Sequence, residues 1–196
     1  MTSQTRNMAK NTSKTKKATK VLTFSLLASL LSSVQAQETQ KADYFCGVDT
    51  PEAAQSIETI IPALYQIVSG DAGAKKDWPL MKSLFAPDAI VTPVFHKKGI
   101  PQASITSVDE FITLNKQIFK NINFYETEVK QTSLVYGHMA TILSHYESRD
   151  DHNKEPYSQG INSFQLLNDG RRWCVISVTW DSDKGGHKID SNTLKS

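Results

Sequence analysis

The chain has 196 residues, with 22 lysines and arginines against 20 aspartates and glutamates. Six of the basic residues and none of the acids lie in residues 1–36, so the other 160 residues hold 16 basic and 20 acidic residues, a net charge of −4. A net negative charge without a basic stripe excludes most modes of nucleic-acid binding, and 160 residues suit one domain with a substantial core.

Residues 1–36 have the pattern of an export signal. A basic stretch ends at Lys20, an apolar run extends from Val21 to Val34, and the small residues at Val34 and Ala36 predict cleavage after Ala36. The apolar run is shorter than the ~20 residues of a bilayer span, which disfavours the alternative of a membrane anchor. We expect a periplasmic or secreted protein, with no membrane association after cleavage and with Met1 or Met8 as its start.

Two cysteines, Cys46 and Cys174, would meet an oxidising compartment after export. A disulfide between them would join the two ends of the domain. The alternative is that both are unpaired and that Cys174 is a small core residue. Because the sequence has no Cys-x-x-Cys motif and no Cys/His cluster, it predicts no metal site, and nothing in it indicates a cofactor.

The first predicted helix follows residues 37–48. Thr50, Pro51 and Glu52 favour a helix start, and Pro62 is expected to kink or divide the helix. Its apolar stripe has helical spacing and comprises Ile57, Ile60, Ile61, Leu64, Ile67 and Val68.

Two further helices are predicted. Asp77 caps a short one that ends at Ala86-Pro87-Asp88, and residues 107–110 form a capping box before another, whose expected buried side is Phe111, Leu114 and Ile118. Residues 89–95 between them read as a strand in which Pro93 indicates an edge or a bulge. Residues 97–106 read as a loop.

From Asn123 onward the pattern changes to strands. Residues 124–131 and 134–149 are followed by a hairpin around Asn168-Asp169-Gly170, which gives four consecutive antiparallel strands. If Leu167 faces Arg171, one hairpin face carries Asn162, Phe164, Leu166, Cys174, Ile176, Val178 and Trp180. Both faces of residues 134–149 are partly apolar, which predicts helices on one face and a second copy of the chain on the other. The predicted domain covers residues 37–183, and residues 184–196 are expected to be a disordered tail.

Several short motifs resemble exported members of the nuclear transport factor 2-like, or SnoaL-like, superfamily. The resemblance covers residues 51–181 and rests on residues 69–73, 77–78, 83–89, 144–149, 160–163, 172–173 and 180–181. It implies an α+β, cone-shaped, cystatin-like fold, in which helices pack on a strongly bent antiparallel sheet around a pocket. This scaffold hosts isomerases, dehydratases, cyclases, binding domains and dimerisation modules, so it does not define a reaction.

Trp180-Asp181 resembles the Tyr-Trp-Asp end of the last strand in ketosteroid isomerases, where the tryptophan lines the pocket. The catalytic aspartate of those enzymes follows a motif similar to residues 88–91 by a few positions. Thr92 and Pro93 occupy the next positions here, and neither can abstract a proton from carbon. The resemblance therefore does not carry the isomerase activity over.

The predicted ligand-binding residues are Trp78, Phe85, Phe95, His96, Tyr146, Asn162 and Trp180. His96 is the candidate general base, although a solvated or structural histidine is an alternative. Tyr146 and Asn162 are candidates for hydrogen bonds to a ligand, or for a satisfied pair in the core. The aromatic residues would wall a pocket, and core packing alone would also explain most of them.

Three functions are consistent with the sequence. The leading hypothesis is an exported homodimer that binds a small, partly apolar organic molecule in the cone. The second is an enzyme of the isomerase, dehydratase or cyclase type, with His96 as base and Tyr146 or Asn162 polarising an oxygen. The third is an interaction module whose own side chains fill its pocket.

Overall fold

The structure is a computed structural model that describes residues 44–190, 193 and 194, all within the unit formed by residues 41–196. The predicted signal peptide, residues 1–36, lies outside the described residues. The helices are α1 (Ile57–Val68), α2 (Trp78–Leu84) and α3 (Val108–Ile118), with short 3-10 turns η1 (Glu52–Ala54) and η2 (Asp183–Gly185). The strands are β1 (Phe85–Lys97), β2 (Ile100–Ala103), β3 (Thr106–Ser107), β4 (Tyr125–Tyr136), β5 (Met139–Arg149), β6 (Ser158–Asn168) and β7 (Trp173–Ser182).

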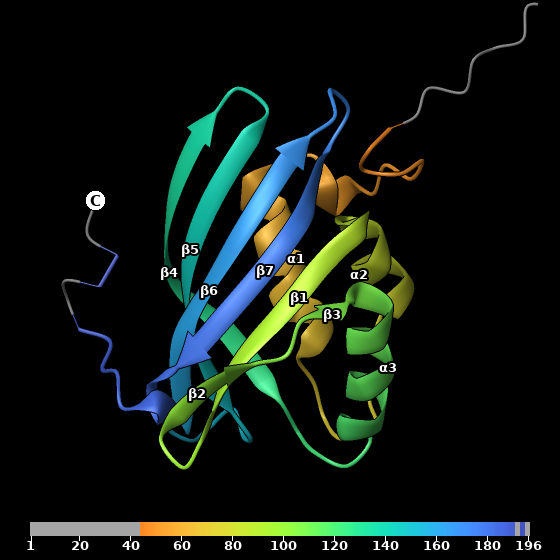
Figure 1. Ribbon diagram of the computed structural model, residues 1–196. Helices are drawn as coiled ribbons and strands as arrows, with labels where there is room; N and C mark the ends of the chain where they lie inside the picture. Colours follow the sequence, from red (N-terminus) through yellow and green to blue (C-terminus); the bar gives the residue numbers. More distant parts are fainter. Residues whose placement is uncertain (1–43, 191–192, 195–196) are drawn as a thin grey trace, which may run out of the picture. The chain divides into compact units, whose positions relative to one another are not determined.

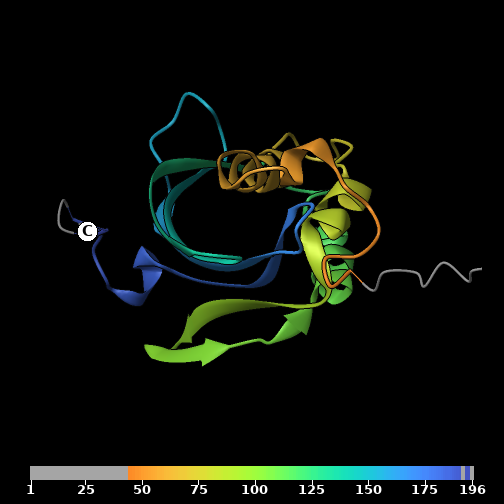
Figure 2. The same ribbon diagram turned by 90° about the horizontal axis from the view of Figure 1, so that it is seen from above.

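The strands form one mixed sheet in the order β2-β1-β7-β6-β5-β4, with β3 paired to β1 (Figure 1). The four strands from β4 to β7 are antiparallel, as predicted, whereas β1 runs parallel to β7. The sheet curves around α1, which lies on its concave side, and α2 and α3 stand near β1 (Figure 2). The predicted α+β fold, with helices packed on a strongly bent sheet, is confirmed.

Helix α1 begins later than predicted. Residues 52–54 form only a 3-10 turn, and the α-helix starts at Ile57, where Ser56 and Thr59 form the capping box. The helix continues through Pro62 as one element. Its predicted stripe is correct, because all six apolar residues of the stripe are buried against the sheet. No helix in the described part of the chain has the length and hydropathy that a membrane span requires.

Helices α2 and α3 begin at their predicted caps. The Asp77 carboxylate accepts the Leu80 N–H at 3.0 Å, and the Ser107 hydroxyl accepts the Glu110 N–H at 3.2 Å. The predicted buried side of α3 is partly wrong, because Leu114 is 60% and Ile118 41% exposed. Val108 and Ile112 are the buried positions instead, so the helix is turned relative to the predicted stripe.

The β4–β5 turn also differs from the prediction. The sequence suggested a break at residues 132–133, but β4 continues to Tyr136 and turns at Gly137, whose φ of +56° favours glycine. Residues 97–106, predicted to be a loop, contain β2, which pairs with the end of β1 around Gly99. Within β5 the side chains alternate between the two faces of the sheet, and Ala140, Ile142, Ser144 and Tyr146 are all buried.

The β6–β7 hairpin has a different register from the predicted one. Asn168 pairs with Trp173, which gives a four-residue loop, and a bulge at Ile176 places Val175 opposite Leu166. Beyond the bulge, Phe164 faces Val178 and Asn162 faces Trp180. The predicted face is wrong for Cys174 and Ile176, because the loop has four residues instead of the three assumed and the pairing next to it is shifted by an odd number of residues. The bulge at Ile176 adds one more residue and returns Val178 and Trp180 to the predicted face.

The segment before η1 is fixed to the start of β7. Cys46 and Cys174 form a disulfide across 128 residues. The Arg172 guanidinium is 1% exposed and donates to the backbone oxygens of Cys46 and Ser83, the latter at 2.7 Å. Arg171 donates to the Gly47 oxygen at 2.7 Å and stacks on Tyr44. Arginines that follow a hairpin turn are usually solvated, whereas Arg172 is buried here.

Candidate functional site

A cavity of about 280 Å³ lies between α1, α3 and the concave face of the sheet. Its walls are mostly apolar, and most of its polar groups come from the ends of β4, β5, β6 and β7. The lining residues are Leu64, Tyr65, Val68, Met81, Phe85, Val91, Val94, Phe111, Asn115, Phe119, Phe124, Glu126, Tyr146, Ser148, Tyr157, Ser158, Asn162, Phe164, Val178, Trp180, Ser182 and Lys184. Apolar walls with few polar groups are typical of small-molecule sites.

Trp180 lines this cavity from β7. The strand pairing places Asn162 beside it and Phe164 beside Val178, so all four side chains share the concave face. The Trp180 ring also meets Phe111 of α3 edge to face, with ring centroids 6.1 Å apart. This aromatic contact holds α3 against the sheet and makes one wall of the cavity rigid.

Glu126 is the ionisable group with the largest cost in the cavity. It lies at the start of β4, where the Ser69 hydroxyl accepts the Glu126 N–H at 2.9 Å and ties the strand to the end of α1. Burial raises the pKa of the Glu126 carboxyl from 4.5 to about 8. Desolvation favours the protonated form of a carboxyl. At neutral pH this side chain is therefore mostly neutral and can donate a hydrogen bond.

The Tyr146 hydroxyl is a second polar group of the cavity. Tyr146 is 4% exposed, and its hydroxyl has no hydrogen-bond partner among the described residues. Its phenol lies directly over Gly160 of the neighbouring strand, where a Cβ atom would overlap both the ring and the Asp181 carbonyl oxygen. Glycine at position 160 thus permits this position of the ring, and burial raises the pKa of the phenol.

A chain of hydrogen bonds runs from the cavity toward β4. The Asn162 amide donates to the Tyr65 hydroxyl at 2.8 Å, and the Tyr65 and Ser144 hydroxyls are 2.6 Å apart. Ser144 donates to the Glu128 carboxylate at 2.5 Å. Because the Ser144 hydroxyl donates its proton to Glu128, Tyr65 must be the donor to Ser144. Each group therefore donates to the next, from Asn162 through Tyr65 and Ser144 to Glu128. Burial raises the pKa of Tyr65, so it stays protonated at neutral pH.

The structure brings together only some of the residues predicted for the site. Phe85, Tyr146, Asn162 and Trp180 line the cavity. The other three lie outside its lining: Trp78 stacks on Phe119 with centroids 6.1 Å apart, Phe95 is 46% exposed, and His96 faces Asp181. Because Pro93 pairs with Trp180 and Val94 reaches the cavity, the last residues of β1 pass beyond it.

Glu126 and Tyr65 were not predicted as site residues. Glu126 and Glu128 alternate with Thr127 and Val129, a pattern that usually indicates a solvated strand face. Tyr65 interrupts the apolar stripe of α1 with a side chain that is itself largely apolar. Two features of the sequence could have indicated these residues. Glu126 and Glu128 lie at alternate positions of one strand, and the neighbouring strand β5 has the polar residues Ser144 and Tyr146 on its inward face.

No protein-family model matches this chain, and no curated protein sequence matches it either. Among solved structures, one similar protein is from Nostoc punctiforme, has a cystatin-like fold and is of unknown function; the identity is 10%, the match covers 66% of this chain and 95% of that one, and the TM-score is 0.50. A nuclear transport factor 2-like protein of unknown function from Shewanella baltica is 14% identical over 66% and 92% of the two chains, with a TM-score of 0.44. The Kfla4162 protein from Kribbella flavida is 13% identical over 63% and 85%, with a TM-score of 0.46.

The likeness to the Nostoc punctiforme structure agrees with the arrangement of α1 inside a curved sheet. The chain has the α+β, cystatin-like fold that the sequence predicted. At these identities the likeness establishes the fold and not an activity.

Proposed function

We propose that this protein binds a small, partly apolar organic molecule that carries an oxygen acceptor, in the cavity beneath Trp180. The observation that supports this most strongly is Glu126, a carboxyl desolvated among apolar walls with its pKa raised to about 8. Such a group costs stability, and the protonated carboxyl and the Tyr146 hydroxyl, which both line the cavity, supply two hydrogen-bond donors for a ligand.

The size and composition of the cavity define the ligand class. A volume of about 280 Å³ suits a molecule of one or two rings. Trp180, Phe111 and Phe164 offer flat apolar contacts, so we expect a ring or a short branched chain as the body of the ligand. The open volume argues against the interaction module with a filled pocket.

Ligand binding is tested with a variant in which a larger side chain fills the cavity. Native mass spectrometry of the protein purified from its own host is expected to detect a retained small molecule in the wild type. Val94→Trp, which fills the cavity from β1, should abolish retention, whereas Val129→Trp, at a 51% exposed position, should not. A panel of small phenols and cyclic ketones, followed by tryptophan fluorescence, provides a second readout. Retention or saturable binding that Val94→Trp leaves intact would contradict the proposal.

A proton-transfer enzyme is a second candidate function. A carboxyl with a pKa near the ambient pH can both give and take a proton, and Tyr146 is a donor for an oxygen that gains negative charge. In this candidate Glu126, and not His96, is the base, because His96 lies outside the cavity lining. In this reaction the Glu126 carboxylate takes a proton from a carbon atom of the substrate and later returns a proton to carbon.

Hydrogen–deuterium exchange tests this chemistry without a known substrate. A cyclic ketone that binds in the cavity should exchange its α-hydrogens in D2O in the presence of the wild type, followed by proton NMR. Glu126→Gln should remove the catalysed exchange, and His96→Ala should retain it. Equal exchange rates with wild type and Glu126→Gln would eliminate Glu126 as the base and leave the binding function.

We also propose that the protein acts outside the cytoplasm as a homodimer. The Cys46–Cys174 disulfide supports an oxidising compartment. The convex side of β4 and β5 supports a self-association surface, because Leu134, Tyr136, Met139 and Leu143 are 72%, 80%, 55% and 37% exposed.

A further inference from the structure

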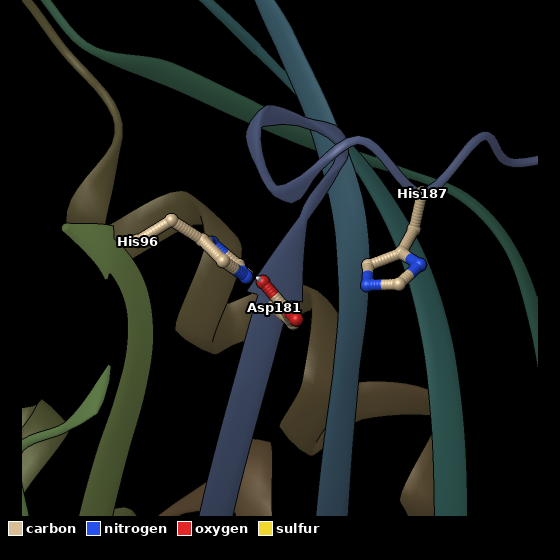
Figure 3. A group of neighbouring side chains, drawn as sticks. All are labelled: His96, Asp181 and His187. Carbon is tan, nitrogen blue, oxygen red and sulfur yellow. Dashed lines mark ion pairs between the residues drawn. The ribbon is translucent and has the colours of Figure 1, made fainter. Parts of the chain in front are cut away.

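His96, Asp181 and His187 come together outside the cavity, although His96 is far from the other two in the sequence. His96 lies near the end of β1, Asp181 near the end of β7, and His187 just after η2 (Figure 3). One ligand atom from each of the three side chains lies within 4.8 Å of the other two. No spacing pattern in the sequence marks this cluster, because its members lie on β1, on β7 and just after η2.

The pairing of β1 with β7 and two glycines explain why these three side chains lie close together. Parallel pairing of β1 with β7 sets Pro93 beside Trp180, which brings the ends of both strands to the same place. Gly185 then lies against the His96 ring, where a Cβ atom would overlap the imidazole. Gly186, with φ of +89°, turns the chain so that His187 faces back toward Asp181. Two glycines thus place the second imidazole.

The distances are close to those of a coordination sphere. His96 Nδ1 and Asp181 Oδ1 are 3.8 Å apart. In a tetrahedral zinc site with bonds of 2.0–2.1 Å, neighbouring ligand atoms are about 3.4 Å apart. The Asp181 side chain is 39% exposed and His187 is exposed, so rotation of both side chains can bring their ligand atoms to the distance that coordination requires. The His96 side chain, only 12% exposed, provides a fixed first ligand.

We propose that His96, Asp181 and His187 bind a divalent first-row transition-metal ion, of which zinc is the best-matched example. Two imidazoles and one carboxylate suit zinc and its neighbours, whereas calcium and magnesium prefer oxygen ligands throughout. The Ser182 N–H donates to Asp181 Oδ1 at 2.7 Å and orients the carboxylate. Three protein ligands leave a fourth position for water or for another molecule.

The bound ion would join three elements. It would fasten the segment after β7 to the end of β1, and Lys184 of this segment lines the cavity beside Ser182, the last residue of β7. The metal site itself does not depend on the proposed ligand in the cavity. The alternative for the same atoms is a plain His96–Asp181 ion pair with His187 nearby by chance, and the two differ in what removal of His187 does.

The experiment is a zinc titration of the purified protein with its disulfide intact and without affinity-tag histidines. Isothermal calorimetry and metal analysis after dialysis are expected to show one zinc ion per chain, and zinc should raise the midpoint of thermal unfolding. His187→Ala should weaken zinc binding at least tenfold and abolish the thermal shift. The matched control is His138→Ala, in the β4–β5 turn, which should bind zinc as the wild type does.

Asp181→Asn provides the second variant, because it preserves the shape of the side chain while removing its charge. It should also weaken zinc binding at least tenfold. His96→Ala is less informative, since it removes the ring that packs on Gly185 and can destabilise the fold. An absence of saturable zinc binding by the wild type, or zinc binding by His187→Ala that equals that of His138→Ala, overturns the proposal.

Discussion

The two ends of β7 contribute differently to the stability of the domain. At its start, Cys174 is bonded to Cys46, and Arg172 donates to two backbone oxygens from other elements. At its far end, Trp180 faces a cavity that holds a desolvated Glu126 and a Tyr146 hydroxyl without a hydrogen-bond partner in the part of the chain that the structure describes. The first end joins elements together, whereas the second retains groups that cost stability. A single strand therefore connects the part of the domain that stabilises the fold to the part that is available for a ligand.

The largest effect is expected from removing the disulfide. Replacement of Cys46 and Cys174 by alanine releases a constraint across 128 residues and should lower the free energy of unfolding by about 2–5 kcal/mol. Urea denaturation of the wild type under oxidising conditions and of the double variant measures the difference. A change below about 0.5 kcal/mol would mean that the start of β7 is not the stabilising end.

Arg172→Leu should have the next largest effect. It leaves the oxygens of Cys46 and Ser83 without their donor in a buried place, and we expect a loss of about 2–3 kcal/mol in the same assay. The control is Arg149→Leu, which removes a partly exposed ion pair with Glu147 and should cost less than about 1 kcal/mol. Equal losses in the two variants would remove the special role of Arg172.

Glu126→Gln should raise the free energy of unfolding at high pH, whereas the two preceding changes lower it. Between the unfolded pKa of about 4.5 and the folded pKa of about 8, the folded state holds a proton that the unfolded state releases. The stability of the wild type should therefore fall as the pH rises through this window, by up to about 1.4 kcal/mol per pH unit. Glu126→Gln should remove this contribution to the slope and be more stable than the wild type at pH 9.

Denaturation midpoints at pH 5, 7 and 9 measure this effect. The control Glu52→Gln, at an exposed position of η1, should follow the wild type. A variant at position 126 that is no more stable than the wild type at high pH would show that the Glu126 carboxyl is not desolvated.

The smallest effect on folding is expected at the convex face. Leu134→Glu combined with Tyr136→Glu should change the unfolding free energy of a single chain by less than about 0.5 kcal/mol, because both side chains are exposed. The same double variant should convert a dimer into a monomer in analytical ultracentrifugation. A wild type that sediments as a monomer at high concentration would refute the proposed self-association through this face.

Much of the fold follows from local signals in the sequence. Asp77 and the Ser107–Glu110 box mark two helix starts correctly, and the alternation of β5 gives its inward face. Trp180 was expected to face a pocket and does line one. The hairpin register was wrong, because the Asn168-Asp169-Gly170 sequence did not reveal a four-residue loop, and the bulge at Ile176 has no signal in the turn.

The site was less predictable than the fold. Glu126 has the pattern of a solvated strand residue, and only the curvature of the sheet around α1 places it in the cavity. Arg172 follows a turn, where arginine is usually solvated, and its burial depends on Cys46 and Ser83 from distant segments. His187 joins His96 only through the turn at Gly186. In each case the decisive contact is long-range, which a local pattern does not encode.

The most direct test of the account is the titration of the Glu126 carboxyl in the folded protein. Carbon-13 NMR of the protein labelled at glutamate side chains, with Glu126→Gln to assign the resonance, measures this pKa alone. We predict a pKa of about 8, which shifts when a cyclic ketone or phenol occupies the cavity. A pKa near the ordinary 4.5, unaffected by such compounds, would contradict a desolvated ligand site beneath Trp180.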